Sequence, residues 1–152
     1  MRARDLMSTH PSIITPHESI VAAARLMRER HVGILPVIDS LETRRLVGII
    51  TDRDIVVRCL ANEHGADCRV RDHMTGGRLE WVGPGADADE VVAKMKDHHI
   101  RRVPVLDIDR GLIGIISVGD LTVRLRPGNP RMMEELEQVL SVPYNAERRE
   151  PS

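Results

Sequence analysis

The stretch Gly48-Ile49-Ile50-Thr51-Asp52-Arg53-Asp54 reads as the end of a buried strand that turns directly into a helix. An apolar run over residues 46–50 stops at a hydroxyl residue, Thr51, which is a good helix N-cap. Asp54 follows three places later, where the acid of a capping box stands. The pattern therefore predicts a strand over 46–50 and a helix over 52–61.

The same design returns 66 residues later as Gly114-Ile115-Ile116-Ser117-Val118-Gly119-Asp120. A helix N-terminus offers unpaired N–H groups and positive dipole charge, which favour a phosphate. Thr51 and Ser117 could each add a hydroxyl there, and Asp54 and Asp120 could each accept hydrogen bonds from the two hydroxyls of a ribose. The early glycine would keep the strand wall open beside a base. Both motifs are candidate nucleotide sites, and the alternative is two capped helices with nothing bound.

The context of the two motifs repeats as well. Asp72-His73-Met74 echoes Asp5-Leu6-Met7, and Trp81-Val82 echoes Ile13-Ile14. A helix capped by Ser19 carries one apolar face, and that face returns after Asp87 at a constant shift of 68 residues. The sequence therefore predicts an internal duplication in which each unit runs β-α-β-β-α.

The predicted fold is α+β, with two such repeats packed about a pseudo-two-fold axis. The predicted domains are a first repeat over 1–61, a linker over 62–69, a second repeat over 70–126, and a C-terminal helix and tail over 127–152. The remaining predicted elements are a lead-in over 3–7, strands over 13–14, 33–38, 81–82 and 112–116, a helix from 19 to about 31, helices over 118–125 and 131–140, and a frayed tail over 145–152. The last helix is expected to be amphipathic, with Met133, Leu136, Val139 and Leu140 on one side.

Composition excludes several classes of protein. The chain has 152 residues, no Phe, one Trp and one Tyr, so its core must be aliphatic. A balance of 22 basic against 23 acidic residues argues against a general nucleic-acid binder, which carries a basic face. No apolar run approaches the roughly 18 residues of a membrane span, and the N-terminus lacks the apolar segment of a secretory signal. A cytoplasmic protein without nucleic-acid or membrane partners is therefore expected.

Cysteine and histidine usage predicts neither a disulfide framework nor a metal site. Cys59 and Cys68 are the only cysteines; Cys59 reads as a small buried hydrophobe on a helix, and a Cys59–Cys68 redox pair is the alternative. The adjacent histidines at 98–99, with His64 and His73 elsewhere, form no C-x-x-C or H-x-x-x-H spacing. No activated Ser or Cys with a partner base is evident, so the sequence predicts a protein that is not an enzyme.

Two copies of G-h-h-[TS]-x-x-D, where h is apolar, each preceded by a P-V-h-D strand, resemble a tandem pair of CBS domains, the module named after cystathionine β-synthase. The resemblance covers roughly residues 3–125. It implies a disc-like pair with two clefts between the repeats, and commonly a homodimer.

Many CBS pairs bind AMP, ADP, ATP or S-adenosylmethionine, so the resemblance implies an adenosine-containing regulatory ligand and no other required cofactor. The residues carried over by position are Asp54 and Asp120 for the ribose; Thr51, Ser117, Arg101 and Arg102 for phosphate; and Ile14, Thr15, Val82 and Gly83 for the base. The first repeat departs from this pattern, because Gly33 and Ile34 stand where the second has its two arginines. Arg53 stands inside the first motif where the second has Gly119, and it joins the candidate ligand residues.

Two functions remain open from the sequence. One is a regulatory sensor of an adenosine-containing ligand. The other is a ligand-free module that presents the helix of residues 52–60, or the C-terminal helix, to an unknown protein target. A homodimer is expected in either case, because the first of these helices carries an apolar surface wider than a single core contact requires. The residues of that surface are Ile55, Val56, Val57, Cys59 and Leu60.

Overall fold

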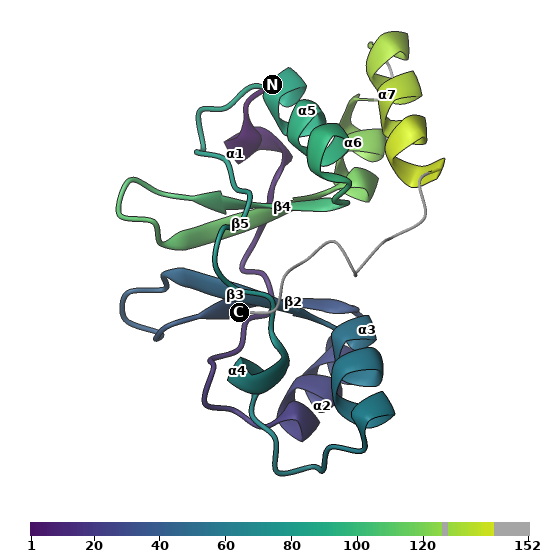
Figure 1. Ribbon diagram of the computed structural model, residues 1–152. Helices are drawn as coiled ribbons and strands as arrows, with labels where there is room; N and C mark the ends of the chain where they lie inside the picture. Colours follow the sequence, from purple (N-terminus) through teal and green to yellow (C-terminus); the bar gives the residue numbers. More distant parts are fainter. Residues whose placement is uncertain (126–127, 142–152) are drawn as a thin grey trace. The chain divides into compact units, whose positions relative to one another are not determined.

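The computed structural model describes residues 1–125 and 128–141, and the chain divides into two compact units (Figure 1). The first-motif unit consists of residues 11–79. The second-motif unit combines residues 1–10 with the described residues from 80 to 141. The predicted C-terminal tail over 145–152 lies outside the described residues.

The first-motif unit packs helices against a two-stranded antiparallel sheet. Its elements are α2 (Ile20–Arg30), β2 (Ile34–Ile38), β3 (Leu46–Thr51), α3 (Asp52–Asp54), the π-helical η1 (Ile55–Cys59), the 3-10 helix η2 (Leu60–Asn62) and α4 (Val70–His73). Leu35 and Ile50 are Cα partners across the sheet, and neither side chain is exposed. These two residues join the apolar faces of α2 and η1 in one aliphatic core, as the absence of Phe requires.

The second-motif unit has a three-stranded sheet in the order β1-β5-β4. Its elements are α1 (Ala3–Leu6), β1 (Ser8–Thr9), α5 (Ala88–His98), β4 (Arg102–Leu106), β5 (Leu112–Ser117), α6 (Val118–Leu125) and α7 (Pro130–Ser141). Helices α5, α6 and α7 pack together, and the core joins Val91 and Met95 to Leu121 and Leu136. Helix α7 buries Met132, Leu136 and Val139, and the predicted Met133 is partly buried against the same core. Leu140, also predicted on this side, is 46% exposed.

The short lead-in segments do not follow the linear order of the repeats. Residues 1–10 precede the first repeat in sequence, yet Ser8 and Thr9 pair with β5 of the second-motif unit. Ala3 N–H donates to the Ala86 carbonyl at 2.7 Å, and the Leu6 side chain is fully buried there. The equivalent lead-in before the second repeat, α4 and Thr75, packs in the first-motif unit, where Thr75 bridges Ile49.

The lead-in segments also explain why each motif has a glycine at its first position. A Cβ on Gly48 would lie 2.7 Å from Met74 Sδ, and a Cβ on Gly114 would lie 2.5 Å from Met7 Sδ. The space beside each glycine is therefore filled by a methionine of a lead-in segment. The expectation that these glycines keep the wall open for a base is wrong in this structure.

Three predicted elements differ in detail. The strands predicted over 13–14 and 81–82 are single bridges, Ile14 to Val37 and Val82 to Val105, because a proline follows each segment within two residues. The helix predicted over 52–61 begins at Asp52 but changes to π and then 3-10 geometry. The helix predicted over 118–125 is confirmed.

Candidate ligand-binding motifs

The second motif forms a capping box at the start of α6. Ser117 N–H and Ser117 Oγ both donate to Asp120 Oδ2, at 2.8 and 2.9 Å. The Asp120 N–H donates back to Ser117 Oγ at 3.0 Å. Among the described residues, the other carboxylate oxygen, Oδ1, accepts only a long 3.4 Å hydrogen bond, from the exposed Ser8 hydroxyl. Since Asp120 is half-buried, one of its oxygens holds the helix start while the other faces a weak and exposed partner.

The first motif forms the same box at the start of α3. Thr51 N–H donates to Asp54 Oδ2 at 3.0 Å, and Asp54 N–H donates to Thr51 Oγ1 at 3.0 Å. Asp54 is only 1% exposed, however, and its Oδ1 lies 3.7 Å from Arg58 Nε without a hydrogen bond. The carboxylate of the first motif is therefore enclosed, whereas that of the second motif is half-exposed.

The candidate basic residues of the second-motif unit take different positions. Arg102 is exposed and is the Cα partner of Ser117 across β4 and β5, so both side chains project from the same face of the sheet. Arg101 is half-buried, and its guanidinium donates to the Leu140 carbonyl at 3.2 Å. In the first-motif unit the partner of Thr51 is Ile34, and the exposed Arg53 is the candidate cation. The structure therefore places Arg102 opposite Ser117, on the same face of the sheet.

The residues predicted to contact a base divide into core and surface positions. The side chains of Ile14 and Val82 are 2% and 1% exposed and belong to the two hydrophobic cores. Thr15 and Gly83, which follow them, are half-buried. A Cβ on Gly83 would meet nothing within 4 Å, so this position leaves open space beside the backbone. Only Thr15 and Gly83 of these four are placed to offer a surface.

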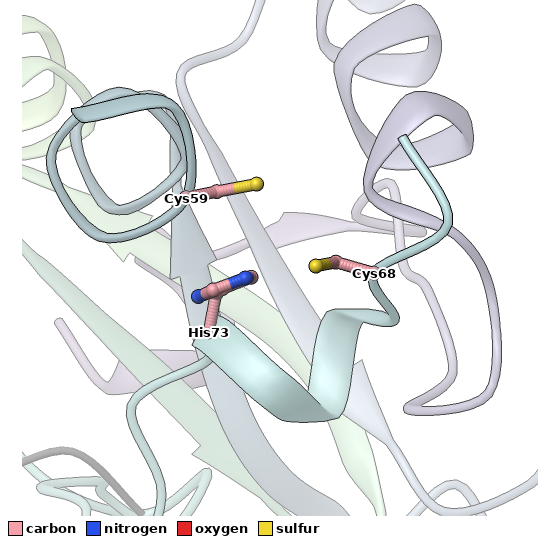
Figure 2. Close-up of side chains that lie close together, drawn as sticks. All are labelled: Cys59, Cys68 and His73. Atoms are coloured by element: carbon pink, nitrogen blue, oxygen red, sulfur yellow. The ribbon is translucent and has the colours of Figure 1, made fainter. Parts of the chain in front are cut away.

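Sequence reasoning missed a cluster of side chains in the first-motif unit. Cys59, Cys68 and His73 each bring a potential ligand atom within 4.8 Å of the others (Figure 2). Burial lowers the pKa of His73, and the neighbouring His64 lowers it further. Burial also raises the pKa of the Cys68 thiol, as does the neighbouring Cys59. The spacing C-x8-C-x4-H matches no short motif, so only the convergence of η1, α4 and the segment between η2 and α4 brings these groups together.

Known proteins share this fold and these repeats. The CBS domain family model matches residues 3–60 and 70–126. Hypoxic response protein 1 of Mycobacterium tuberculosis is 34% identical over 123 residues, which are 81% of this chain and 84% of that protein. A crystal structure titled Hypoxic Response Protein I with two coordinated zinc ions has a TM-score of 0.72 at 32% identity, covering 82% of this chain and 98% of that chain.

Two further solved structures contain adenosine compounds. CBSX2 in complex with AMP has a TM-score of 0.69 at 28% identity, covering 82% of this chain and 95% of that one. The CBS domain pair of protein MJ0100, in complex with 5′-methylthioadenosine and S-adenosyl-L-methionine, has a TM-score of 0.68 at 30% identity, covering 83% and 96%. None of the helices in the described ranges has the length and apolar character needed to cross a membrane. With an α+β fold, two copies of the motif and a family model that matches both repeats, the chain belongs to the CBS domain family as a tandem pair.

Proposed function

We propose that this CBS pair is a regulatory sensor that binds an adenosine-containing ligand: AMP, ADP, ATP or S-adenosylmethionine. The observation that carries the proposal is the half-exposed carboxylate of Asp120. Its Oδ2 is held by Ser117, whereas its Oδ1 has, in the part of the chain that the structure describes, only the 3.4 Å contact with Ser8. A carboxylate oriented in this way can accept hydrogen bonds from ribose hydroxyls without losing the helix cap.

Charge and space around Asp120 support the same ligand class. The exposed Arg102 lies on the same face of the sheet as Ser117, where its guanidinium can bind a phosphate by charge-assisted hydrogen bonds. Gly119 is exposed, and a Cβ there would meet only Ser117 Oγ, at 3.5 Å. Similar chains crystallised with AMP and with S-adenosylmethionine show that related CBS pairs bind such compounds. A ligand that binds one conformation better than another shifts the population toward it, which is how such a sensor acts without catalysis.

A thermal-shift screen tests the proposal. A ligand at 100 times its dissociation constant stabilises the folded chain by about 2.7 kcal/mol, which is a melting shift of several degrees for a chain of this size. We expect such a shift with at least one of the four compounds and none with the matching guanosine nucleotides. The 2′-deoxy form of the active compound should shift less, because it lacks one hydroxyl for Asp120. If all four compounds leave the melting temperature unchanged at millimolar concentration, the ligand-free interaction module replaces this proposal.

We also propose that the chain forms a homodimer. Val56, Val57 and Leu60 are 54%, 46% and 60% exposed on adjoining turns of η1 and η2, whereas Ile55 and Cys59 of the same segment are buried. Apolar side chains exposed together on one helical surface are typical of an interface. Light scattering at micromolar concentration should give twice the chain mass, and Val57→Asp should shift it toward the monomer. A monomer mass for the unmodified chain would contradict this proposal.

A further inference from the structure

The cysteine–histidine cluster of the first-motif unit is separate from the motif at Asp120. Figure 2 shows Cys59 and His73 with their side chains close together, and Cys68 facing both of them. The potential ligand atoms of the three residues all lie within 4.8 Å of one another. Cys59 is 1% exposed and His73 is 5% exposed, while Cys68 is half-buried. Two thiols and an imidazole therefore converge at a largely enclosed point.

Each backbone position in the cluster is held by its own element. Cys59 is the last residue of η1, where π geometry widens the helical turn; such π segments occur frequently at functional sites. The Cys68 carbonyl accepts a hydrogen bond from Ile20 N–H at 2.9 Å, which ties it to the start of α2. His73 is the last residue of α4. The three side chains therefore approach one another from three anchored places, as the ligands of a preorganised site do.

A fourth side chain stands beside these three. His64 Nδ1 lies 3.4 Å from His73 Nε2, and the ring centroids are 5.2 Å apart. The His64 N–H donates to the Cys59 carbonyl at 3.0 Å, so its backbone is fixed next to the cluster while its side chain is exposed. With zinc–nitrogen bonds of about 2.0–2.1 Å, two nitrogens on a tetrahedral ion are separated by about 3.4 Å. The two imidazoles already have the spacing of a pair of zinc ligands.

We propose that Cys59, Cys68, His73 and His64 bind one zinc ion. Two thiolates and two imidazoles form the Cys2His2 donor set of a four-coordinate structural zinc site, and soft sulfur with nitrogen selects zinc over magnesium or calcium. Tetrahedral coordination puts two sulfurs about 3.8 Å apart and a sulfur and a nitrogen about 3.5 Å apart. The potential ligand atoms of Cys59, Cys68 and His73, which all lie within 4.8 Å of one another, therefore need to approach by about 1 Å, and the exposed His64 side chain would turn toward them.

The bound ion would fasten a loop. Residues 63–67 are all exposed, and they link η2 to Cys68. A metal held from Cys59, His64, Cys68 and His73 ties both ends and the middle of this loop to the core of the first-motif unit. A Cys59–Cys68 disulfide would also close the loop, but both cysteines are free in this structure, and a disulfide leaves the pair of imidazoles unused. The arrangement as a whole fits a metal better than a disulfide.

Cobalt titration of the full chain tests the site. Chain stripped by a chelator and kept reduced should bind one Co²⁺, with the thiolate-to-cobalt charge-transfer band and the intense visible bands of tetrahedral coordination, and one equivalent of Zn²⁺ should abolish both. Cys68→Ser should weaken Co²⁺ binding more than about 100-fold, because even changes next to a metal ligand cost about 10–100-fold. His64→Ala should keep the charge-transfer band, alter the visible bands and cost about 10-fold. His17→Ala, another exposed histidine of the same unit, is the matched control and should bind normally.

Melting experiments separate a metal site from a folding defect. Zn²⁺ should raise the melting temperature of the unmodified chain and of His17→Ala, and leave that of Cys68→Ser unchanged. His64→Ala changes only an exposed side chain, so it still tests the proposal if Cys68→Ser fails to fold. Absence of the cobalt bands in the reduced chain, or a Cys59–Cys68 disulfide in protein purified without oxidant, would overturn the proposal. The result does not depend on adenosine binding, because none of the four residues belongs to either motif.

Discussion

The two motifs form the same capping box, yet their carboxylates have different surroundings. Asp54 and Asp120 each have an arginine four residues further along, Arg58 and Arg124. Arg58 lies 3.7 Å from Asp54, whereas Arg124 donates to the Asp5 carbonyl of α1 at 2.7 Å. Asp54 is 1% exposed, whereas Asp120 is half-buried and its Oδ1 accepts a hydrogen bond from the exposed Ser8 hydroxyl. The two motifs thus form the same helix start, but one carboxylate is buried and the other is half-buried with one oxygen near the surface.

Removing the enclosed carboxylate should have the largest effect on folding. Asp54→Ala deletes a helix cap and leaves the buried Thr51 N–H without its acceptor, so the free energy of unfolding should fall by about 2–3 kcal/mol. Asp120→Ala removes a cap at a half-exposed position and should cost at most about 1 kcal/mol. Urea unfolding of both variants measures the difference. Equal losses would show that the two boxes are equivalent after all.

Alanine substitutions at the motif glycines should cause the next largest loss of stability. A Cβ on Gly48 would lie 2.9 Å from the Thr75 carbonyl oxygen as well as 2.7 Å from Met74 Sδ, so Gly48→Ala forces backbone as well as side chain to move. Overpacking of this kind costs about 1–3 kcal/mol. The three atoms nearest a Cβ on Gly114 all belong to the Met7 side chain and none to the backbone, so Gly114→Ala should cost less, about 1 kcal/mol.

A second substitution sharpens this glycine comparison. Gly114→Ala combined with Met7→Ala should show a smaller loss than the sum of the two single changes, because the clash is removed with the methionine. The same urea unfolding measures it. Additive losses would mean that Met7 does not explain the glycine.

Substituting the basic residues should have a smaller effect, on ligand affinity, that depends on whether the ligand carries a phosphate. Arg102→Ala should weaken AMP or ATP binding by up to about fivefold, since an exposed ion pair contributes about 0.2–1 kcal/mol. It should leave S-adenosylmethionine affinity unchanged, because that ligand has no phosphate. Arg53→Ala, measured in the same titrations, tests the cation of the first motif. Loss of S-adenosylmethionine affinity in Arg102→Ala would contradict a phosphate role.

The optical signal of Trp81 should change least. Val82 beside it is buried in the core, while Trp81 is half-buried with the Arg110 guanidinium carbon 5.6 Å from its ring centroid. An adenosine ligand beside Gly83 should alter this half-buried environment and change the fluorescence of the only tryptophan. Guanosine nucleotides control for light absorbed by the ligand. Measuring the Arg110→Ala variant shows how much the neighbouring cation contributes to the Trp81 fluorescence. An unchanged spectrum at saturating ligand would place the base away from residues 81–83.

Local features of the fold could be predicted, because they depend on neighbours in sequence. Thr51 and Ser117 cap helices with their acids three residues on, and both boxes are observed. The packing of residues 1–10 in the second-motif unit could not be predicted, since it depends on contacts such as that of Ala3 with Ala86. The sequence repeat and the compact unit are therefore different divisions of this chain.

The candidate sites also depend on contacts that the sequence does not predict. The approach of Arg58 Nε to within 3.7 Å of Asp54 Oδ1 could not be predicted, because a sequence gives no direction for an arginine side chain. The cysteine–histidine cluster depends on the convergence of η1, α4 and an exposed loop, with spacings that no short metal motif uses. A buried cysteine and a redox pair were the only alternatives that the sequence offered for Cys59.

Calorimetric titration of a ribose ligand and its 2′-deoxy form into the unmodified chain, Asp120→Ala and Asp54→Ala is the most direct test of the central claim, that Asp120 binds the ribose. Asp120→Ala should lose about 1.5–3 kcal/mol of binding, roughly 10- to 150-fold in affinity. The difference between the ribose and deoxyribose ligands should be present in the unmodified chain and in folded Asp54→Ala, and should vanish in Asp120→Ala. If Asp120→Ala binds both ligands as tightly as the unmodified chain does, Asp120 is only a helix cap and the account is wrong.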